Sequence, residues 1–236
     1  GIVPESMKDK IVDEIVWKIP DNINYLYKND LMLLDFMATN NWERVVYFTS
    51  LSDIQNVLGI DKYLHQEGLA HRFMPVVAQD YIKGAGGIYI DGSYELLMAD
   101  DIRWGNLNAE GVAVDPESRR NVLFVKQAYM RLAQALQKRN QNDSAVAVID
   151  RCLEFFPDEK LPYDYYMLMY PDIYYKAGAT EKGDALARQI VDNAVDNLRY
   201  YSELDGRFAN YYVEDIRDNL AVINEMSNAA DRNKRI

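Results

Sequence analysis

Residues that form cross-links and metal sites are scarce in this chain of 236 amino acids. It has a single cysteine, Cys152, which excludes a disulfide within the chain. Its only histidines are His65 and His71, and their spacing is not the i, i+4 spacing of a metal pair on one helix face. No cysteine or carboxylate cluster completes a set of ligands. We therefore expect no metal site and no cofactor.

Positive charge and long apolar runs are also in short supply. The 26 basic residues are outnumbered by 37 acidic ones, giving a formal net charge of -11. This balance argues against a nucleic-acid partner, whose phosphates attract lysine and arginine. No apolar run approaches the roughly 18–20 residues of a membrane-spanning helix, and no signal peptide is visible. The chain begins with Gly1 rather than Met, and we expect it to be a piece of a longer protein.

Complete catalytic motifs are missing from the sequence as well. The glycine-rich run KGAGG at 83–87 lacks the Gly-Lys-Ser/Thr ending of a phosphate-binding loop, and we interpret it as a flexible loop. Asp100 and Asp101 are adjacent, so on a helix they point in different directions and do not form an acid and base pair across a sugar. We therefore predict that this chain has no catalytic residues and is not itself an enzyme.

The stretch 126–157 carries the clearest pattern that is present. Large and small apolar residues recur at helical spacing on both sides of a polar break at 138–143, and Pro157 ends the second run because proline cannot continue a helix. Ala133 and Ala145 would let two antiparallel helices approach closely, while Tyr129 and Ile149 fill the seam. This arrangement resembles a tetratricopeptide repeat, a repeat that implies a scaffold or interaction module.

Further helices are predicted after this repeat. One covers Tyr163–Lys176, and Gly178 then makes a left-handed turn. Thr180 caps the next helix, which runs to Leu198. A last amphipathic helix follows over 208–223, and the polar tail 227–236 should fray.

The first half predicts a small mixture of strands and helices. Asp30 should cap a helix that continues to Met37. Segment 44–50 is typical of a buried strand and 71–77 of another strand, with Pro75 at its edge or end. Weaker patterns indicate an extended segment over 11–19, a helix over 51–58, a helical turn over 62–69, a brief strand over 88–91, and a helix over 94–103 capped by Ser93.

These elements predict an α+β fold that is mainly helical. We expect a small α/β unit with capping helices over residues 1–117, of which 106–117 form a polar linker. An all-α, tetratricopeptide-repeat-like superhelix should follow over residues 118–236.

Tyrosine is the residue type that most invites a binding role. Six tyrosines fall in 163–175, and Tyr200, Tyr201, Tyr211 and Tyr212 follow on the next two helices. Tyrosine combines apolar area with a hydroxyl, which suits both protein interfaces and sugar faces. The stripe of Tyr166, Tyr170 and Tyr174, at i, i+4 and i+8, is better explained as seam packing between helices. Tyr163, Tyr165 and Tyr175 lie off that stripe and are the candidate groove residues.

Three phrases together resemble one known family: YKNDLMLLDFMATNNWERVVYFT at 27–49, LGIDKYLHQEGLAHRFMPV at 58–76, and CLEFFPDEKLPYDYYML at 152–168 with YYKAG at 174–178. They are similar to the soluble C-terminal region of bacterial multi-spanning membrane proteins whose membrane part resembles protein O-mannosyltransferases. The resemblance implies an extracytoplasmic, periplasmic tail of an inner-membrane protein. The catalytic carboxylates of that family lie in the membrane part, so none is assigned here.

Two functions remain open on this basis. The first is a non-catalytic scaffold whose concave face binds a protein or peptide. The second is a module that binds glycan or positions the acceptor for the membrane-embedded transferase.

Overall fold

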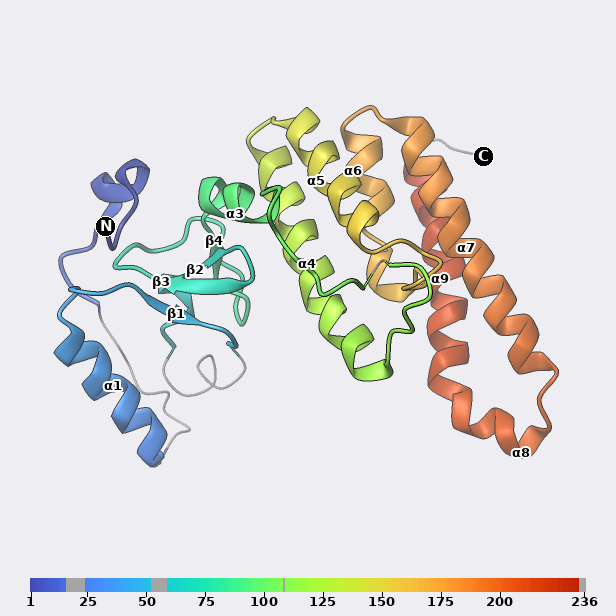
Figure 1. Cartoon of the computed structure of the whole chain (residues 1–236), viewed down its shortest axis with the longest axis horizontal. Coiled ribbons are helices and arrows are strands. Elements are labelled where there is room, and N and C mark those ends of the chain that lie inside the picture. The colour runs from blue at the N-terminus through green and yellow to red at the C-terminus, as the bar shows by residue number, and fades with distance from the viewer. Residues whose placement is uncertain (16–23, 52–58, 108, 234–236) are drawn as a thin grey trace. The chain divides into compact units, whose positions relative to one another are not determined.

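The computed structural model describes residues 1–15, 24–51, 59–107 and 109–233. It forms two compact units, Gly1–Ala99 and Asp100–Ile236. The first unit contains the strands, and long helices dominate the second (Figure 1). The predicted α+β, mainly helical class is therefore confirmed.

A mixed four-stranded sheet lies at the centre of the first unit, in the order β1-β3-β2-β4. Strands β2 (Leu64–Glu67) and β3 (Ala70–Phe73) form a hairpin whose turn contains Gly68 at φ +65, a conformation that glycine adopts readily. Strand β1 (Val46–Phe48) is antiparallel to β3, and β4 (Gly87–Ile88) is parallel to β2.

Among the described residues of this unit, the helices beside the sheet are η1 (Glu5–Lys10), α1 (Lys28–Asn40), η2 (Asp61–Tyr63) and α3 (Ile90–Leu97). Leu33, Leu34 and Met37 of α1 pack against one apolar cluster, whose buried members include Leu64 and Phe73. A second cluster joins the start of the chain to the segment after β3, and its buried members are Val3, Met74 and Val76.

Several local predictions for this unit were wrong. Residues 64–67 form a strand rather than a helical turn, because pairing with β3 outweighs a short helical pattern. Strand β1 lies at a sheet edge with Tyr47 exposed, not buried. Asp30 is the third residue of α1, where its carboxylate accepts from the N–H of Tyr27 at 2.8 Å. Ser93 is inside α3, which ends at Leu97 rather than Arg103.

Two weaker predictions fall partly on residues that the structure does not describe. The extended segment 11–19 is described only as far as residue 15, and in that part Ile11 forms an isolated antiparallel bridge with Val76. The helix over 51–58 lies outside the described residues from position 52 onward.

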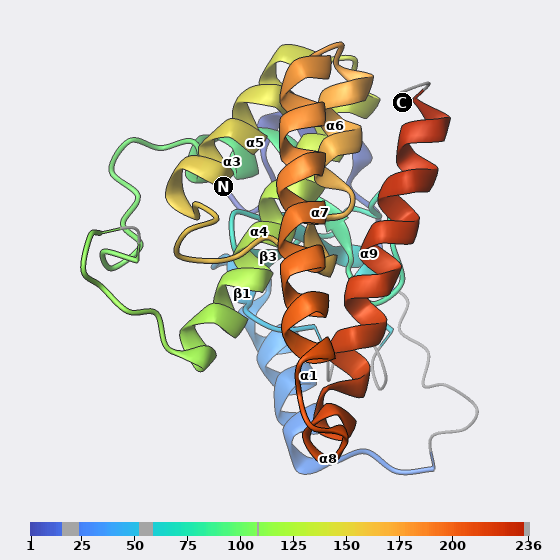
Figure 2. The ribbon, with the colours of Figure 1, turned by 90° about the vertical axis from the view of Figure 1, so that its right-hand side faces the viewer.

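The second unit is built mainly from helices that pack in chain order. They are α4 (Pro116–Lys138), α5 (Asn142–Phe155), α6 (Tyr170–Lys176), α7 (Thr180–Ser202) and α9 (Val213–Arg232), with the short elements η3 (Tyr165–Met167), α8 (Gly206–Ala209) and η4 (Asn210–Tyr212). Helices α4, α5, α6 and α7 stand side by side, and α9 runs along α7 (Figures 1 and 2). Asp115 caps α4 by accepting from the N–H groups of Glu117 and Ser118.

The seam between α4 and α5 follows the predicted pattern. Tyr129, Leu132 and Ala133 of α4 and Ile149 and Cys152 of α5 are all fully buried. Gly178 takes the left-handed turn before α7, at φ +79, as predicted. Both helices of the proposed repeat therefore form. Their assignment to the tetratricopeptide class remains a prediction.

Corrections are also needed in the second unit. Residues 163–176 do not form one helix: Asp164 starts the short η3, and Pro171 occupies the first turn of α6. The chain does not fray at 227, because α9 continues to Arg232 and buries Ala229.

The two compact units divide at Ala99, earlier than the boundary at 117 that the sequence predicted. The segment after Asp100 joins the helices through several contacts. The Trp104 ring packs on Phe155 and Phe156, and the Lys160 ammonium donates to the Val112 carbonyl at 3.3 Å.

Candidate functional site

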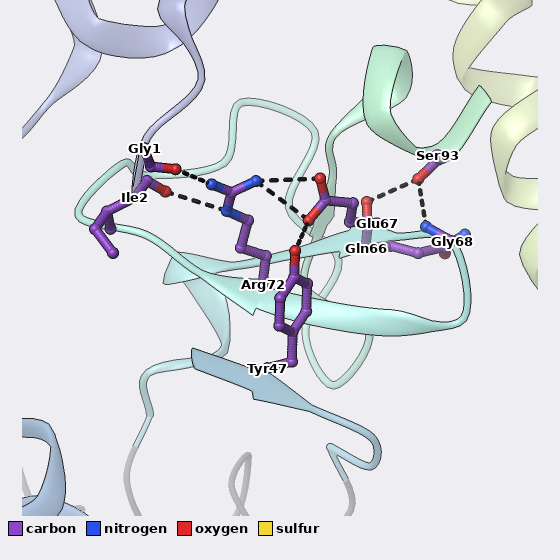
Figure 3. Close-up of polar contacts among 8 residues, drawn as sticks. All are labelled: Gly1, Ile2, Tyr47, Gln66, Glu67, Gly68, Arg72 and Ser93. Carbon is purple, nitrogen blue, oxygen red and sulfur yellow. Dashed lines mark hydrogen bonds and ion pairs between the residues drawn. The ribbon is translucent and has the colours of Figure 1, made fainter. Parts of the chain in front are cut away.

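An arginine-centred polar cluster lies on one face of the sheet in the first unit (Figure 3). The register pairs Tyr47 with Arg72 and Arg72 with His65, so these residues form a cross-strand row. Glu67 lies two residues beyond His65 and therefore shares that face. The Arg72 guanidinium donates to both carboxylate oxygens of Glu67, at 3.1 and 3.3 Å, and the Tyr47 hydroxyl donates to the same carboxylate.

The other donors of Arg72 reach the beginning of the chain. Its Nε donates to the Ile2 carbonyl at 3.1 Å, and its Nη2 donates to the Gly1 carbonyl. The Arg72 and Glu67 side chains are each only 10% exposed. A buried ion pair with this many protein partners is held in one geometry. We interpret it as a clamp that fixes residues 1 and 2 against the β2–β3 hairpin.

Ser93 extends this polar network to α3 (Figure 3). Its hydroxyl donates to the Gln66 carbonyl at 2.9 Å and accepts from the Gly68 N–H at 3.2 Å. Gly92 is needed beside it, because a Cβ there would lie 2.4 Å from the Tyr89 ring and 2.8 Å from Glu67 Oε1. The polar groups of this network are therefore occupied with contacts that hold the hairpin, α3 and the start of the chain together.

His65 and the glycine-rich loop are also engaged within the first unit. His65 Nε2 lies 2.8 Å from the Val76 carbonyl, and burial lowers the pKa of the imidazole. The Gly84 N–H donates to Asp61 at 3.0 Å, and so does the Tyr81 hydroxyl at 2.8 Å. Among the described residues, no group of three histidine, cysteine or acidic side chains is arranged to hold a metal ion.

Tyr163, the first candidate groove residue, belongs to the interior of the second unit, where only 9% of it is exposed. The Lys126 ammonium lies 5.2 Å from the centre of its ring. This ammonium also donates to the Leu161 carbonyl at 3.3 Å and contacts Met167 Sδ at 3.4 Å. Burial lowers the pKa of Lys126 and raises that of Tyr163. Tyr163 is therefore a packing residue that covers a buried cation.

The other two candidate groove residues have different neighbours. Tyr165 in η3 is 44% exposed and meets the Tyr166 ring edge-on, with centroids 5.9 Å apart. Tyr175 in α6 is half-buried, and its hydroxyl donates to Asp184 of α7 at 3.1 Å. Of the three, Tyr165 presents the most ring surface to solvent.

The stripe of Tyr166, Tyr170 and Tyr174, which the sequence analysis explains as seam packing, is only partly buried. Tyr170 and Tyr174 lie in the interior, whereas Tyr166 is 52% exposed. The Tyr170 hydroxyl donates to the Lys126 carbonyl at 2.7 Å and lies 3.6 Å from Cys152 Sγ. Cys152 is fully buried, and burial raises the pKa of its thiol to about 12. The thiol is consequently poorly suited to act as a nucleophile.

A more exposed group of tyrosines lies where α7 ends and α9 begins, at the α8 end of the helix pair in Figure 2. The rings of Tyr201 and Tyr212 are stacked, with centroids 5.1 Å apart at 26°. Tyr200 meets Tyr201 edge-on at 5.6 Å. We call Tyr200, Tyr201, Tyr211 and Tyr212 the tyrosine cluster. Tyr211 is 82% exposed and Tyr200 is 55% exposed.

The sequence analysis includes these four tyrosines among the residues suited to binding, but its candidate groove residues are others. A usable signal was the pair of Tyr-Tyr doublets on either side of the Asp205–Gly206 turn. Two antiparallel helices joined by a short connection bring residues near that connection together. Doublets on both sides of the turn therefore indicate neighbouring rings at one end of a helix pair.

The stretch of chain that carries the tyrosine cluster is rich in acidic residues. The stretch from Asp196 to Asp218 contains six acidic residues and three arginines. Burial and the nearby Asp215 carboxylate both raise the pKa of Tyr201. Two of the arginines are already paired within their own helices, Arg199 with Asp196 at 2.7 Å and Arg217 with Glu214 at 2.6 Å.

An open hollow of about 440 Å³ lies beside α5 in the same unit. Its carboxylate Asp150 already accepts from the Tyr174 hydroxyl at 2.7 Å and from the Lys182 ammonium at 2.5 Å. The lining residues are Asp143, Val146, Ala147, Asp150, Ala177, Gly178 and Ala179. The tyrosine cluster offers more exposed aromatic surface than this hollow and is the stronger candidate.

Comparison with protein families gives a match to the model described as TMEM260-associated domain 2, over residues 1–91. The matched stretch contains the whole sheet and the arginine-centred cluster. Searches of curated proteins and of solved structures gave no match. The first unit is thus similar to an accessory domain of a membrane protein. No helix among the described residues is long and apolar enough to cross a lipid bilayer.

Proposed function

We propose that this chain is a non-catalytic protein-interaction domain, in which the tyrosine cluster of the second unit is the contact surface. The first unit would attach the domain to its parent, a membrane protein related to glycosyltransferases, on the extracytoplasmic face. The family match over residues 1–91 supports the accessory role.

The observation that carries the interaction role is the exposure of linked aromatic rings. Tyr200, whose ring meets the Tyr201 ring edge-on, and Tyr211, which precedes Tyr212 in the chain, each leave more than half of their surface in water. Tyrosine is enriched at energetically dominant interface positions, because a large ring becomes buried at a small cost in side-chain entropy. Phe208 and Val213 add exposed apolar surface at the same end of the helix pair.

The experiment is site-specific photocrosslinking in the native membrane. A photoreactive phenylalanine derivative replaces Tyr211 in the full-length gene product, and a matched variant carries it at the exposed Lys138 at the end of α4. We expect a discrete crosslinked protein band from position 211 and none from position 138. Equal labelling at both positions, or none at either, would contradict the proposal.

Glycan binding is a second candidate function, and the same surface favours it. Exposed tyrosine rings next to carboxylates can stack on sugar faces and accept hydrogen bonds from sugar hydroxyls. Calorimetric titration of the chain with oligosaccharides tests this directly. Heat of binding that disappears in the Tyr200→Ala variant would favour the glycan role. Absence of heat at millimolar sugar would leave the protein-interaction role.

A further inference from the structure

We infer that the tyrosine cluster recognises a cationic peptide segment, one that carries at least two arginine or lysine side chains. This inference rests on the proposed interaction function and specifies the chemistry of the partner.

The charge around the cluster determines which sign of charge a partner should carry. Between Asp196 and Asp218 acidic residues outnumber arginines by six to three. Arg199 and Arg217 each form an ion pair inside their own helix, which partly neutralises them. Exposed carboxylates such as Glu203 and Asp215 therefore set the local potential. An anionic partner would be repelled, whereas a cationic one would be attracted from beyond contact distance.

The rings provide the short-range part of the recognition. A guanidinium or ammonium group is attracted to the face of an aromatic ring within about 6 Å of its centre. Tyr211 is the most exposed tyrosine of the cluster, and Tyr200 offers a second exposed ring on the neighbouring helix. Asp215 is exposed and stands four positions after Tyr211, so a carboxylate follows the most exposed ring closely in the chain. A cation on either exposed ring would also be attracted by the exposed carboxylates of the same stretch.

The second unit already contains such a combination with an internal cation. The Lys182 ammonium lies 5.9 Å from the centre of the Tyr174 ring and 2.5 Å from Asp150. The Tyr174 hydroxyl donates to the same carboxylate at 2.7 Å. Tyrosine and aspartate from neighbouring helices thus hold a lysine in this fold. At the tyrosine cluster the rings and carboxylates are present and exposed, so the cation can be supplied by a partner.

Chemical-shift mapping with defined probes tests the inference on the chain of 236 residues. The cationic probe is the acetylated, amidated peptide Gly-Arg-Gly-Arg-Gly-Arg, and the matched control replaces each arginine with glutamate. We expect the cationic probe alone to shift the amide resonances of 200–203 and 211–218. Its affinity should fall as salt rises, because exposed charges are screened.

A double variant separates this site from general attraction to an acidic protein. Tyr211→Ser with Asp215→Asn should weaken binding of the cationic probe by about tenfold, because one cation–π contact and one surface charge pair are lost. The matched control, Tyr25→Ser with Asp35→Asn, alters an exposed tyrosine and an exposed aspartate of the first unit and should leave the affinity unchanged.

Three outcomes would overturn the inference: no shift with the cationic probe, shifts spread over every acidic surface, or the same resonances moving with neutral maltotriose. The last outcome would point to a sugar site. None of these results removes a crosslink from position 211. A persisting crosslink would show that the interaction function stands while the cationic specificity fails.

Discussion

The two units stabilise their interiors in different ways. The first unit buries polar side chains in a small sheet and in the helix α3 beside it, including His65, Gln66 and Arg72 of the sheet and Ser93 of α3. Their hydrogen bonds join residues up to 71 positions apart in the sequence. The second unit buries mainly apolar helix seams, and among its described residues Lys126 is the one charged side chain in the interior.

This difference indicates which amino-acid substitutions each unit tolerates. Apolar seams depend on volume and area, so a conservative exchange costs little when the volume is kept. A buried polar cluster depends on each partner, because removing one leaves another without compensation. We therefore expect polar substitutions to affect the first unit more and steric substitutions to affect the second.

Replacing Arg72 with alanine should have the largest effect. Glu67 would be left buried without its cation, and the carbonyls of Gly1 and Ile2 would lose their donor. Breaking a buried pair in this way costs about 3–5 kcal/mol. Hydrogen exchange should accelerate in residues 1–12 and 64–73 and stay unchanged in α4 and α5. Equal acceleration in both units would refute the contrast, and Arg72→Lys should recover part of the loss.

Replacing Lys126 with methionine should stabilise the second unit by on the order of 1–3 kcal/mol near neutral pH, because a buried ammonium no longer has to be desolvated. Burial lowers the pKa of Lys126 in the folded state below its ordinary value of 10.5. Unfolding therefore takes up a proton between the lowered pKa and 10.5, and wild-type stability rises with pH in that window.

The advantage of Lys126→Met over the wild type should consequently shrink as pH rises toward 10.5. Urea unfolding of both proteins at several pH values measures this difference, and the exposed Lys138→Met serves as the control. A difference that does not change with pH, or a methionine variant that is less stable, would show that the contacts of the ammonium with Leu161 and Met167 outweigh its desolvation.

The helices of the second unit were the predictable part of the fold. The 3.6-residue period of Tyr129, Leu132, Ala133 and Leu136 reports a buried face directly, and all four are buried. The break at Tyr163–Lys176 was missed because the whole stretch is rich in tyrosine. Asp164, which caps η3, and Pro171, in the first turn of α6, mark the break.

The contacts of the arginine-centred cluster cannot be predicted from the sequence alone. It depends on the register that places Arg72 opposite Tyr47 and His65, and on the return of residues 1 and 2 to the same place. Short strands carry little periodic signal, so 62–69 was predicted as helical and the register stayed hidden. The sequence predicts the tyrosine cluster only in part. It places these tyrosines on two successive helices, but it does not predict that α7 packs along α9 and brings the rings together.

Replacing Gly183 with alanine tests whether the second unit is sensitive to added side-chain volume. A Cβ at this position in α7 would lie 2.5 Å from the Tyr175 ring, so α6 and α7 would have to separate or the ring would have to move. Overpacking of this kind costs about 1–3 kcal/mol. Gly206→Ala is the matched control, since nothing lies within 4 Å of a Cβ there. Thermal unfolding should show a lower midpoint for Gly183→Ala alone.

Replacing Tyr47 with phenylalanine should have the smallest effect, about 1 kcal/mol or less. The hydroxyl donates to Glu67, but the carboxylate keeps both contacts with Arg72, and the Tyr47 ring is 47% exposed. In the Arg72→Lys background the same change should cost more, because the ammonium holds Glu67 with fewer donors in a less fixed geometry. A double-mutant cycle by urea unfolding measures this coupling. A loss above about 2 kcal/mol from Tyr47→Phe alone would mean that the phenol, rather than the guanidinium, holds the buried carboxylate. The first unit would then depend on its sheet edge more than on its clamp.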